Sequence, residues 1–224
     1  MEWSQRRPTG LISGPLGFLV RTWKVTRLIG HKHRFLRNNR LSFPLDKPMF
    51  ESGFLEGFKQ ATEARWRVKS FDPMIYGLQF QQGTRWNAGL SNEQIAEYES
   101  ALRVRFPHDF KAFLRKMNGT DLPTLNVHGF CDYESVGVYS YPRDIELVKR
   151  RVEIASDLTG AGFKLLPEAR LVPVFQDRYV VCSSNLDDSV VLCVVLLFVR
   201  ASNAFVYANS LQEYLQKEFL EAGL

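Results

Sequence analysis

The sequence predicts an α+β fold, in which a mixed or antiparallel sheet packs against helices that precede it and a C-terminal helix follows. Two observations predict this class. Apolar residues recur at helical spacing between residues 50 and 158, whereas β-rich runs follow one another after residue 170. A capping-box pattern at Ser210 and Glu213 then predicts the last helix.

Charge divides the chain into a basic extension, residues 1–48, and a more acidic remainder. The extension holds ten Lys and Arg against two acids, a net charge of +8, and the rest carries 19 bases against 22 acids, a net charge of −3. Four interpretations of the extension stay open: a twin-arginine export signal, a transit peptide, a tail that binds RNA or anionic lipid, or a non-native stretch upstream of a start at Met49. The excess of basic residues lies in the extension and therefore gives no support for nucleic-acid binding by residues 49–224.

Residues 49–83 are expected to form a helix and a docking arm. Apolar residues at helical spacing predict the helix over about 50–66. Pro73 and Gly77 break this pattern. The apolar residues of 71–80 are then expected to dock on the core as an irregular arm.

Two further helices have clear local signals. Ser91 and Gln94 have the spacing of a capping box, which predicts a helix start at Ser91. A second helix is expected from Pro107 to Asn118, with Gly119 in the left-handed conformation of a helix C-cap. The residues expected on its buried stripe are Phe110, Phe113, Leu114 and Met117.

The remaining elements are predicted from periodicity and β-branched content. A third helix is expected over about 142–158, and strands are expected over 124–127, 135–139, 171–175, 178–183, 190–198 and 204–207. The run 190–199 is almost wholly apolar, which predicts a central strand covered on both faces.

Three blocks of the sequence resemble a known family. The first block comprises Gly89-Leu90-Ser91, Glu93-Gln94-Ile95, Glu99, Leu102, Val104, Phe106-Pro107, Asp109-Phe110, Phe113-Leu114 and Asn118-Gly119. The second is Leu171-Val172-Pro173-Val174, and the third runs from Ser210 to Leu220. In this order they resemble the opening helical pair, a strand and the closing helix of the SUKH superfamily, and more narrowly its bacterial branch related to the yeast cell-wall-assembly (Smi/Knr) regulator.

The resemblance covers about residues 84–220, so a SUKH-like domain is expected over 84–224. It implies an α+β domain without enzymatic activity. Many bacterial relatives resemble immunity proteins, which neutralise a cognate toxin domain, often a nuclease, by binding to it, and other relatives resemble scaffolds in signalling. The chain departs from the family at Gln176-Asp177-Arg178, where the family often has a glycine-rich acidic turn.

No catalytic or metal-binding constellation can be assembled from the sequence. Outside the basic extension the candidate bases are His108 and His128. His128 precedes Cys131 and Asp132, but a zinc site needs about four ligands and no second pair has suitable spacing. No phosphate-binding loop or dinucleotide glycine motif is present. We therefore expect no enzymatic activity, no metal and no cofactor.

Cysteine usage and hydropathy bear on the compartment. Three cysteines are too few, and odd in number, for a disulfide framework, which favours a reducing, cytoplasmic environment. Cys182 and Cys193 lie in apolar runs and are expected to be buried thiols. No apolar run approaches the ~20 residues needed to span a bilayer.

The leading hypothesis is an immunity protein that neutralises a bacterial toxin domain by direct binding. An intracellular scaffold or regulatory protein without a toxin partner is the alternative, and a hydrolase or nuclease is the third. Aromatic residues with a polar group are enriched at interfaces, and acids complement a basic toxin. On these grounds the candidate partner-binding residues are Trp86, Asp121, Tyr133, Tyr139, Tyr141, Asp177, Tyr179, Asp187 and Asp188.

Overall fold

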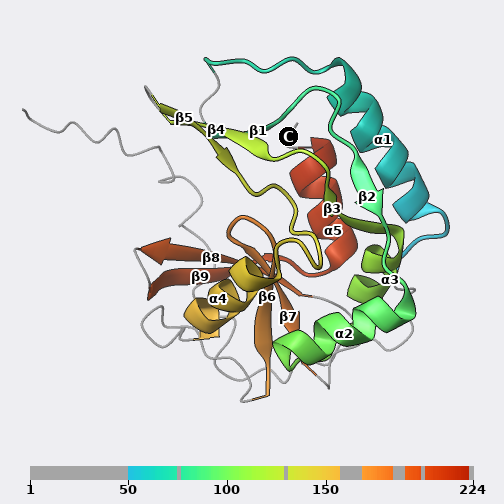
Figure 1. The fold of residues 1–224 in the computed structure, drawn as a ribbon, viewed down its shortest axis with the longest axis vertical. Coiled ribbons are helices and arrows are strands. Elements are labelled where there is room, and N and C mark those ends of the chain that lie inside the picture. Colours follow the sequence, from blue (N-terminus) through green and yellow to red (C-terminus); the bar gives the residue numbers. More distant parts are fainter. Residues whose placement is uncertain are drawn as a thin grey trace, which may run out of the picture. The chain divides into compact units, whose positions relative to one another are not determined.

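The computed structural model has an α+β fold, as predicted (Figure 1). It describes residues 50–74, 77–128, 131–156, 168–183, 190–197 and 200–221. These residues belong to one compact unit of the chain. The predicted basic extension, residues 1–48, lies outside the described residues.

Helix α1 (Phe54–Val68) opens the described part of the chain, close to the predicted range. It buries Phe58, Thr62 and Trp66, which recur every four residues and therefore share one face of the helix. The Phe58 ring meets the ring of Phe219 edge-on, at 5.7 Å between centroids. Helix α1 thus packs on the C-terminal helix rather than standing apart from the core.

The predicted capping box is confirmed at the start of helix α2 (Asn92–Leu102). The Ser91 side chain accepts a hydrogen bond from the Gln94 backbone N–H at 3.2 Å, and the Gln94 side chain accepts one from the Ser91 N–H at 2.9 Å. The helix ends at Arg103, which has a left-handed conformation with φ of 53°. This geometry bends the chain sharply toward the next helix.

Helix α3 (His108–Lys116) ends earlier than predicted, because Met117 is extended and opens strand β3 (Met117–Thr120). Gly119 has the expected positive φ, 69°, but it lies within β3 and caps no helix. A Cβ atom there would lie 2.7 Å from the carbonyl oxygen of Val138. The glycine therefore allows the segment before α4 to approach β3 closely.

Two small antiparallel sheets and one helix complete the first half of the fold. One sheet has the order β1-β4-β5 and comprises β1 (Gly77–Phe80), β4 (Thr124–His128) and β5 (Cys131–Ser135). The other pairs β2 (Trp86–Ala88) with β3.

Two predictions for this half of the chain differ from the structure. The arm of residues 71–80, expected to be irregular, contains strand β1. The strand expected over 135–139 is not formed; only Val138 bridges to Phe175 there, and α4 (Ile145–Ser156) follows.

The main sheet is wholly antiparallel, with the order β6-β7-β8-β9. Its strands are β6 (Arg170–Phe175), β7 (Arg178–Cys182), β8 (Val191–Leu197) and β9 (Arg200–Ala208). Strand β8 lies between two neighbours, and Val191 and Leu192 pack into different apolar clusters. Because successive side chains point to opposite faces, β8 is covered on both faces at this point, as predicted.

The C-terminal helix begins as α5 (Leu211–Leu215), capped by the Ser210 hydroxyl as predicted, and continues as a π-helix (Gln216–Glu221). Arg65 of α1 donates hydrogen bonds to the carbonyl oxygens of Phe219 at 2.8 Å and Leu220 at 2.9 Å. Carbonyl groups in the last turn of a helix lack partners within the helix. Arg65 supplies those partners from another element.

An aromatic cluster joins α1, the small sheets and the C-terminal helix. Trp86 of β2 lies 5.8 Å from Phe219 and 5.9 Å from Phe113 between ring centroids. Phe113 and Leu114 of α3 are buried, as predicted from its apolar stripe. The core therefore includes both the predicted helical pair and the segment that precedes it.

Candidate protein-binding surface

Three of the aromatic residues predicted to contact a partner are core residues instead. Trp86, Tyr139 and Tyr179 are 5%, 6% and 0% exposed, so their side chains are not available to a docking protein. Trp86 Nε1 donates a hydrogen bond to the Thr62 hydroxyl at 2.8 Å, which satisfies the polar group of the indole inside the core. The prediction that these three residues form a contact surface is wrong, because packing rather than residue type decides their exposure.

Tyr139 lies beneath helix α4 and beside the main sheet. Its backbone N–H donates to the Val174 carbonyl at 3.1 Å, and the Arg151 guanidinium of α4 lies 5.9 Å from its ring centroid. Burial raises the pKa of the Tyr139 hydroxyl above its usual value. This tyrosine therefore stays neutral and lies between Arg151 of α4 and strand β6.

Asp121 is the predicted residue that is most clearly accessible. It lies in the turn between β3 and β4, where its Oδ1 atom accepts hydrogen bonds from the backbone N–H groups of Arg85 at 2.7 Å and Leu122 at 2.8 Å. Its own N–H donates to the Arg85 carbonyl at 3.0 Å. These bonds fix the orientation of an exposed carboxylate, beside the partly exposed side chain of Leu122.

Asp177 lies at the tip of the β6–β7 hairpin and is 43% exposed at its side chain. It forms an ion pair with Arg178, which also donates from Nε to Glu218 Oε2 at 3.1 Å. The Arg178 guanidinium lies 4.0 Å from the ring centroid of Tyr207. The charge of Asp177 is therefore accessible but partly balanced by its neighbour.

The other predicted residues fall into two groups. Tyr141 is half-buried and stacks on Tyr98 of α2 at 4.7 Å, so only part of it is accessible. Tyr133 lies in β5, paired with Asn126, but its side chain lies outside the described residues, as do the whole of Asp187 and Asp188. The structure brings Trp86 and Asp121 together at β2–β3. The bridge between Val138 and Phe175 brings the segment that holds Tyr139 to the end of β6, two residues before Asp177.

Sequence reasoning missed the exposed apolar residues. They are Val68, Met74, Leu122, Phe205 and Val206, with exposed fractions of 77%, 80%, 36%, 46% and 40%. Phe205 and Val206 are adjacent in β9, and two adjacent apolar residues in a strand point to both faces. Their adjacency was the signal in the sequence, and it does not by itself distinguish an exposed edge strand from a strand that is covered on both faces.

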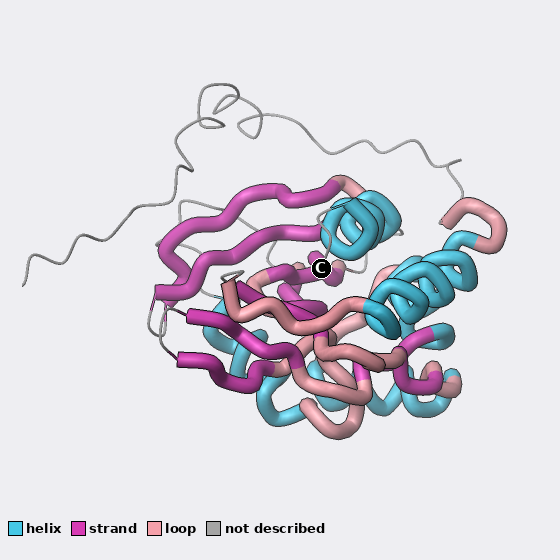
Figure 2. The backbone as a smooth tube through the Cα atoms, turned by 90° about the horizontal axis from the view of Figure 1, so that it is seen from above, coloured by secondary structure: helices cyan, strands magenta, loops and turns pink. Residues whose placement is uncertain are grey.

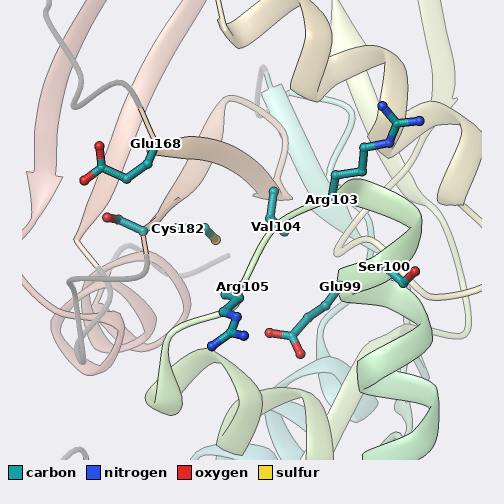
Figure 3. A pocket seen from close by; sticks show the side chains of 8 residues that line it. Glu99, Ser100, Arg103, Val104, Arg105, Glu168 and Cys182 are labelled. Carbon is teal, nitrogen blue, oxygen red and sulfur yellow. The ribbon is translucent and has the colours of Figure 1, made fainter.

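A pocket of about 580 Å³ lies between the end of α2 and the start of the main sheet. Figure 3 shows Glu99 and Arg105 on one side and Glu168 and Cys182 on the other. Glu99 Oε1 accepts from the Phe106 N–H at 2.6 Å and lies 2.8 Å from Lys111 Nζ. This carboxylate is thus engaged in structure.

The pocket lining combines two arginines and two glutamates with the buried thiol of Cys182. Burial raises the pKa of Cys182 well above its usual value, so the thiol stays protonated at neutral pH and is a poor nucleophile. In the described part of the chain, no group of three His, Cys, Asp or Glu side chains could hold a metal ion. The side chains of His128, Cys131 and Asp132, weighed above as zinc ligands, lie outside the described residues.

Hydropathy of the folded elements gives one further finding. Among the helices that the structure describes, none has the length and apolar character needed to cross a bilayer.

Comparison with known proteins gives one clear relationship. A search of curated proteins finds no match. The model of the SMI1 / KNR4 family (SUKH-1) matches residues 89–217, which include α2, α3, α4, the whole main sheet and α5. This match covers more than half of the chain and agrees with the blocks of residues that resemble the SUKH superfamily. The chain therefore belongs to the SMI1 / KNR4 family (SUKH-1).

Proposed function

We propose that this chain is a non-catalytic protein-binding domain, and specifically an immunity protein that neutralises a bacterial toxin domain by direct binding. Membership of the SMI1 / KNR4 family (SUKH-1) carries this proposal, because SUKH domains include immunity proteins. The pocket chemistry is compatible with a binding role, since its thiol is protonated and its Glu99 carboxylate is engaged in structural hydrogen bonds.

The surface favoured for the toxin is the pair of turns that carry Asp121 and Asp177. Both residues stand at hairpin or turn tips, where a docking protein reaches them first. Fixed carboxylates at the rim of an interface accelerate association with a basic partner and add little to its lifetime. Asp121 is held by two backbone N–H groups, so its charge is placed without loss of side-chain freedom on binding.

The decisive experiment tests the products of the genes that neighbour the gene of this chain as candidate toxins. Co-expression of the full chain should restore growth to cells that produce the toxin domain, and the two purified proteins should form a stable 1:1 complex by light scattering. If the neighbouring product binds but is not toxic, the chain is a regulator and not an immunity protein. If no complex forms and growth is not restored, the proposal is wrong.

A paired substitution tests the surface. Asp121→Asn with Asp177→Asn keeps hydrogen-bond acceptors at both turns and removes two charges. It should slow association several-fold at low salt and have little effect at high salt, because salt screens exposed charges. Glu93→Gln with Glu97→Gln removes the same charge from the exposed face of α2 and serves as the control. A larger effect of the α2 pair would place the toxin on the helices.

A further inference from the structure

Strand β9 forms an open edge of the main sheet. It pairs with β8 on one side, and no described strand pairs with its other side. Figure 2 shows β9 as the outermost strand of this sheet, leading into the C-terminal helix. The opposite edge, β6, is contacted at its C-terminal end, where Val138 bridges to Phe175 and the Tyr139 N–H donates to the Val174 carbonyl.

The open edge has apolar side chains on both of its faces. Phe205 is 46% exposed and Val206 is 40% exposed, although both lie in the middle of a nine-residue strand. Proteins usually protect such an edge with charged residues, proline or a covering segment. Residues 201–208 contain no charged residue and no proline, so neither charge nor proline protects this edge.

We propose that β9 pairs antiparallel with β9 of a second copy of this chain, about a two-fold axis, and joins the two main sheets. The neutral sequence of 201–208 favours a second copy as the occupant. Two identical strands that run antiparallel place no like charges opposite each other there, and Arg200 falls at the outer end of the pair. Apolar side chains of each copy then cover those of the other.

The geometry predicts a closed dimer and not a fibre. A two-fold axis pairs the same edge of both copies, so the β9 edge of each copy is used up in the pair and none is left for further growth. At the C-terminal end of the strand, Lys217 Nζ donates a hydrogen bond to the Tyr207 carbonyl at 3.2 Å. This carbonyl is therefore occupied, and the edge available for pairing stops before it. The pairing is therefore short, and a short interface gives a weak, concentration-dependent dimer.

The test is the mass of the full chain across a hundredfold range of concentration, by sedimentation equilibrium. The wild type should shift from monomer to dimer, and Val206→Lys should stay monomeric with an unchanged far-UV spectrum. Val68→Lys is the control, because Val68 is a still more exposed valine on α1. A dimer that survives Val206→Lys, or one that is lost equally in Val68→Lys, would overturn the proposal.

Hydrogen exchange of the wild type decides the matter even if Val206→Lys fails to fold. The amides of 203–206 that face away from β8 should become slower to exchange as the protein concentration rises. If these amides are protected at every concentration, another part of the chain covers the edge and the proposal fails. If the chain stays monomeric and they exchange freely throughout, the edge has no occupant and the proposal fails as well. None of these outcomes bears on toxin binding, so this inference stands apart from the proposed function.

Discussion

Single residues with positive φ set two close contacts in this fold. Gly119 has a φ of 69° within β3, where a side chain would collide with the backbone of the segment before α4. Gln176 has a φ of 51° at the β6–β7 turn, a backbone conformation that glycine adopts without strain. Its side chain donates to the Val136 carbonyl at 2.7 Å, and its own carbonyl accepts from Arg151 at 3.2 Å. Those bonds stabilise a conformation that costs a non-glycine residue about 1–2 kcal/mol.

Substitution of Gly119 should be strongly destabilising. In Gly119→Ala the new Cβ would lie 2.7 Å from the Val138 carbonyl oxygen and 2.8 Å from that of Tyr139. Strain and overpacking together should lower the free energy of unfolding by about 2–4 kcal/mol, as measured by urea denaturation. Gly57→Ala is the matched control, because a Cβ there meets open space on α1 and should stabilise the helix by about 0.5–1 kcal/mol. Equal stability of both variants would contradict the close approach at β3.

At the scale of elements, local sequence signals predicted where helices begin better than where they end. The Ser91 capping box could be read from the sequence because all its hydrogen bonds join residues three positions apart. The end of α3 could not, because Met117 pairs with Ala88 of β2, and this distant pairing outweighs the local cap signal of Gly119. The exposure of the candidate site residues was likewise predictable only where it depends on neighbouring residues in the sequence. Asp121 could be placed at a turn from its neighbours, whereas the burial of Tyr179 depends on elements far away in the sequence.

Arg65 couples two elements, and its removal should affect the C-terminal helix first. Arg65→Met keeps much of the aliphatic side chain and removes both hydrogen bonds to the carbonyls of Phe219 and Leu220. The free energy of unfolding should fall by about 1.5–3 kcal/mol, the range for hydrogen bonds to charged groups. Amide exchange of 216–221 should become faster than in the wild type. Arg67→Met, an exposed position on the same helix, should leave both measurements unchanged; unchanged exchange in Arg65→Met would show that the contact is dispensable.

At the scale of the whole molecule, the folded core begins before the family match does. Residues 89–217 match the family, but Phe58, Trp66 and Phe80 are also buried in the main cluster. Composition revealed the change from a basic to a slightly acidic sequence near residue 48, and the helical spacing of apolar residues revealed α1. Neither could show that α1 is an integral part of the core, because that depends on its contacts with the C-terminal helix.

Two truncations separate the extension from the core. A chain of residues 49–224 should keep a melting temperature within a few degrees of the full chain, because a polar extension contributes few buried contacts. A chain of residues 89–224 should not unfold cooperatively, since each buried aromatic residue removed costs about 3–5 kcal/mol against a total stability of about 5–15 kcal/mol. Calorimetry distinguishes these results. A large loss of stability in the 49–224 chain would mean that the extension packs on the domain.

The contact between α1 and the C-terminal helix has a consequence for synthesis on the ribosome. The Arg65 bond to Phe219 spans 154 residues, and the Glu51 N–H donates to Gln212 at 3.0 Å across 161 residues. At about 5–20 residues per second, α1 is made roughly 8–30 s before its partner exists. During that interval the apolar face of α1 is available to chaperones or to other nascent chains. Completion of the fold is therefore tied to the final residues, and a product released early would expose the aromatic face that the finished molecule buries.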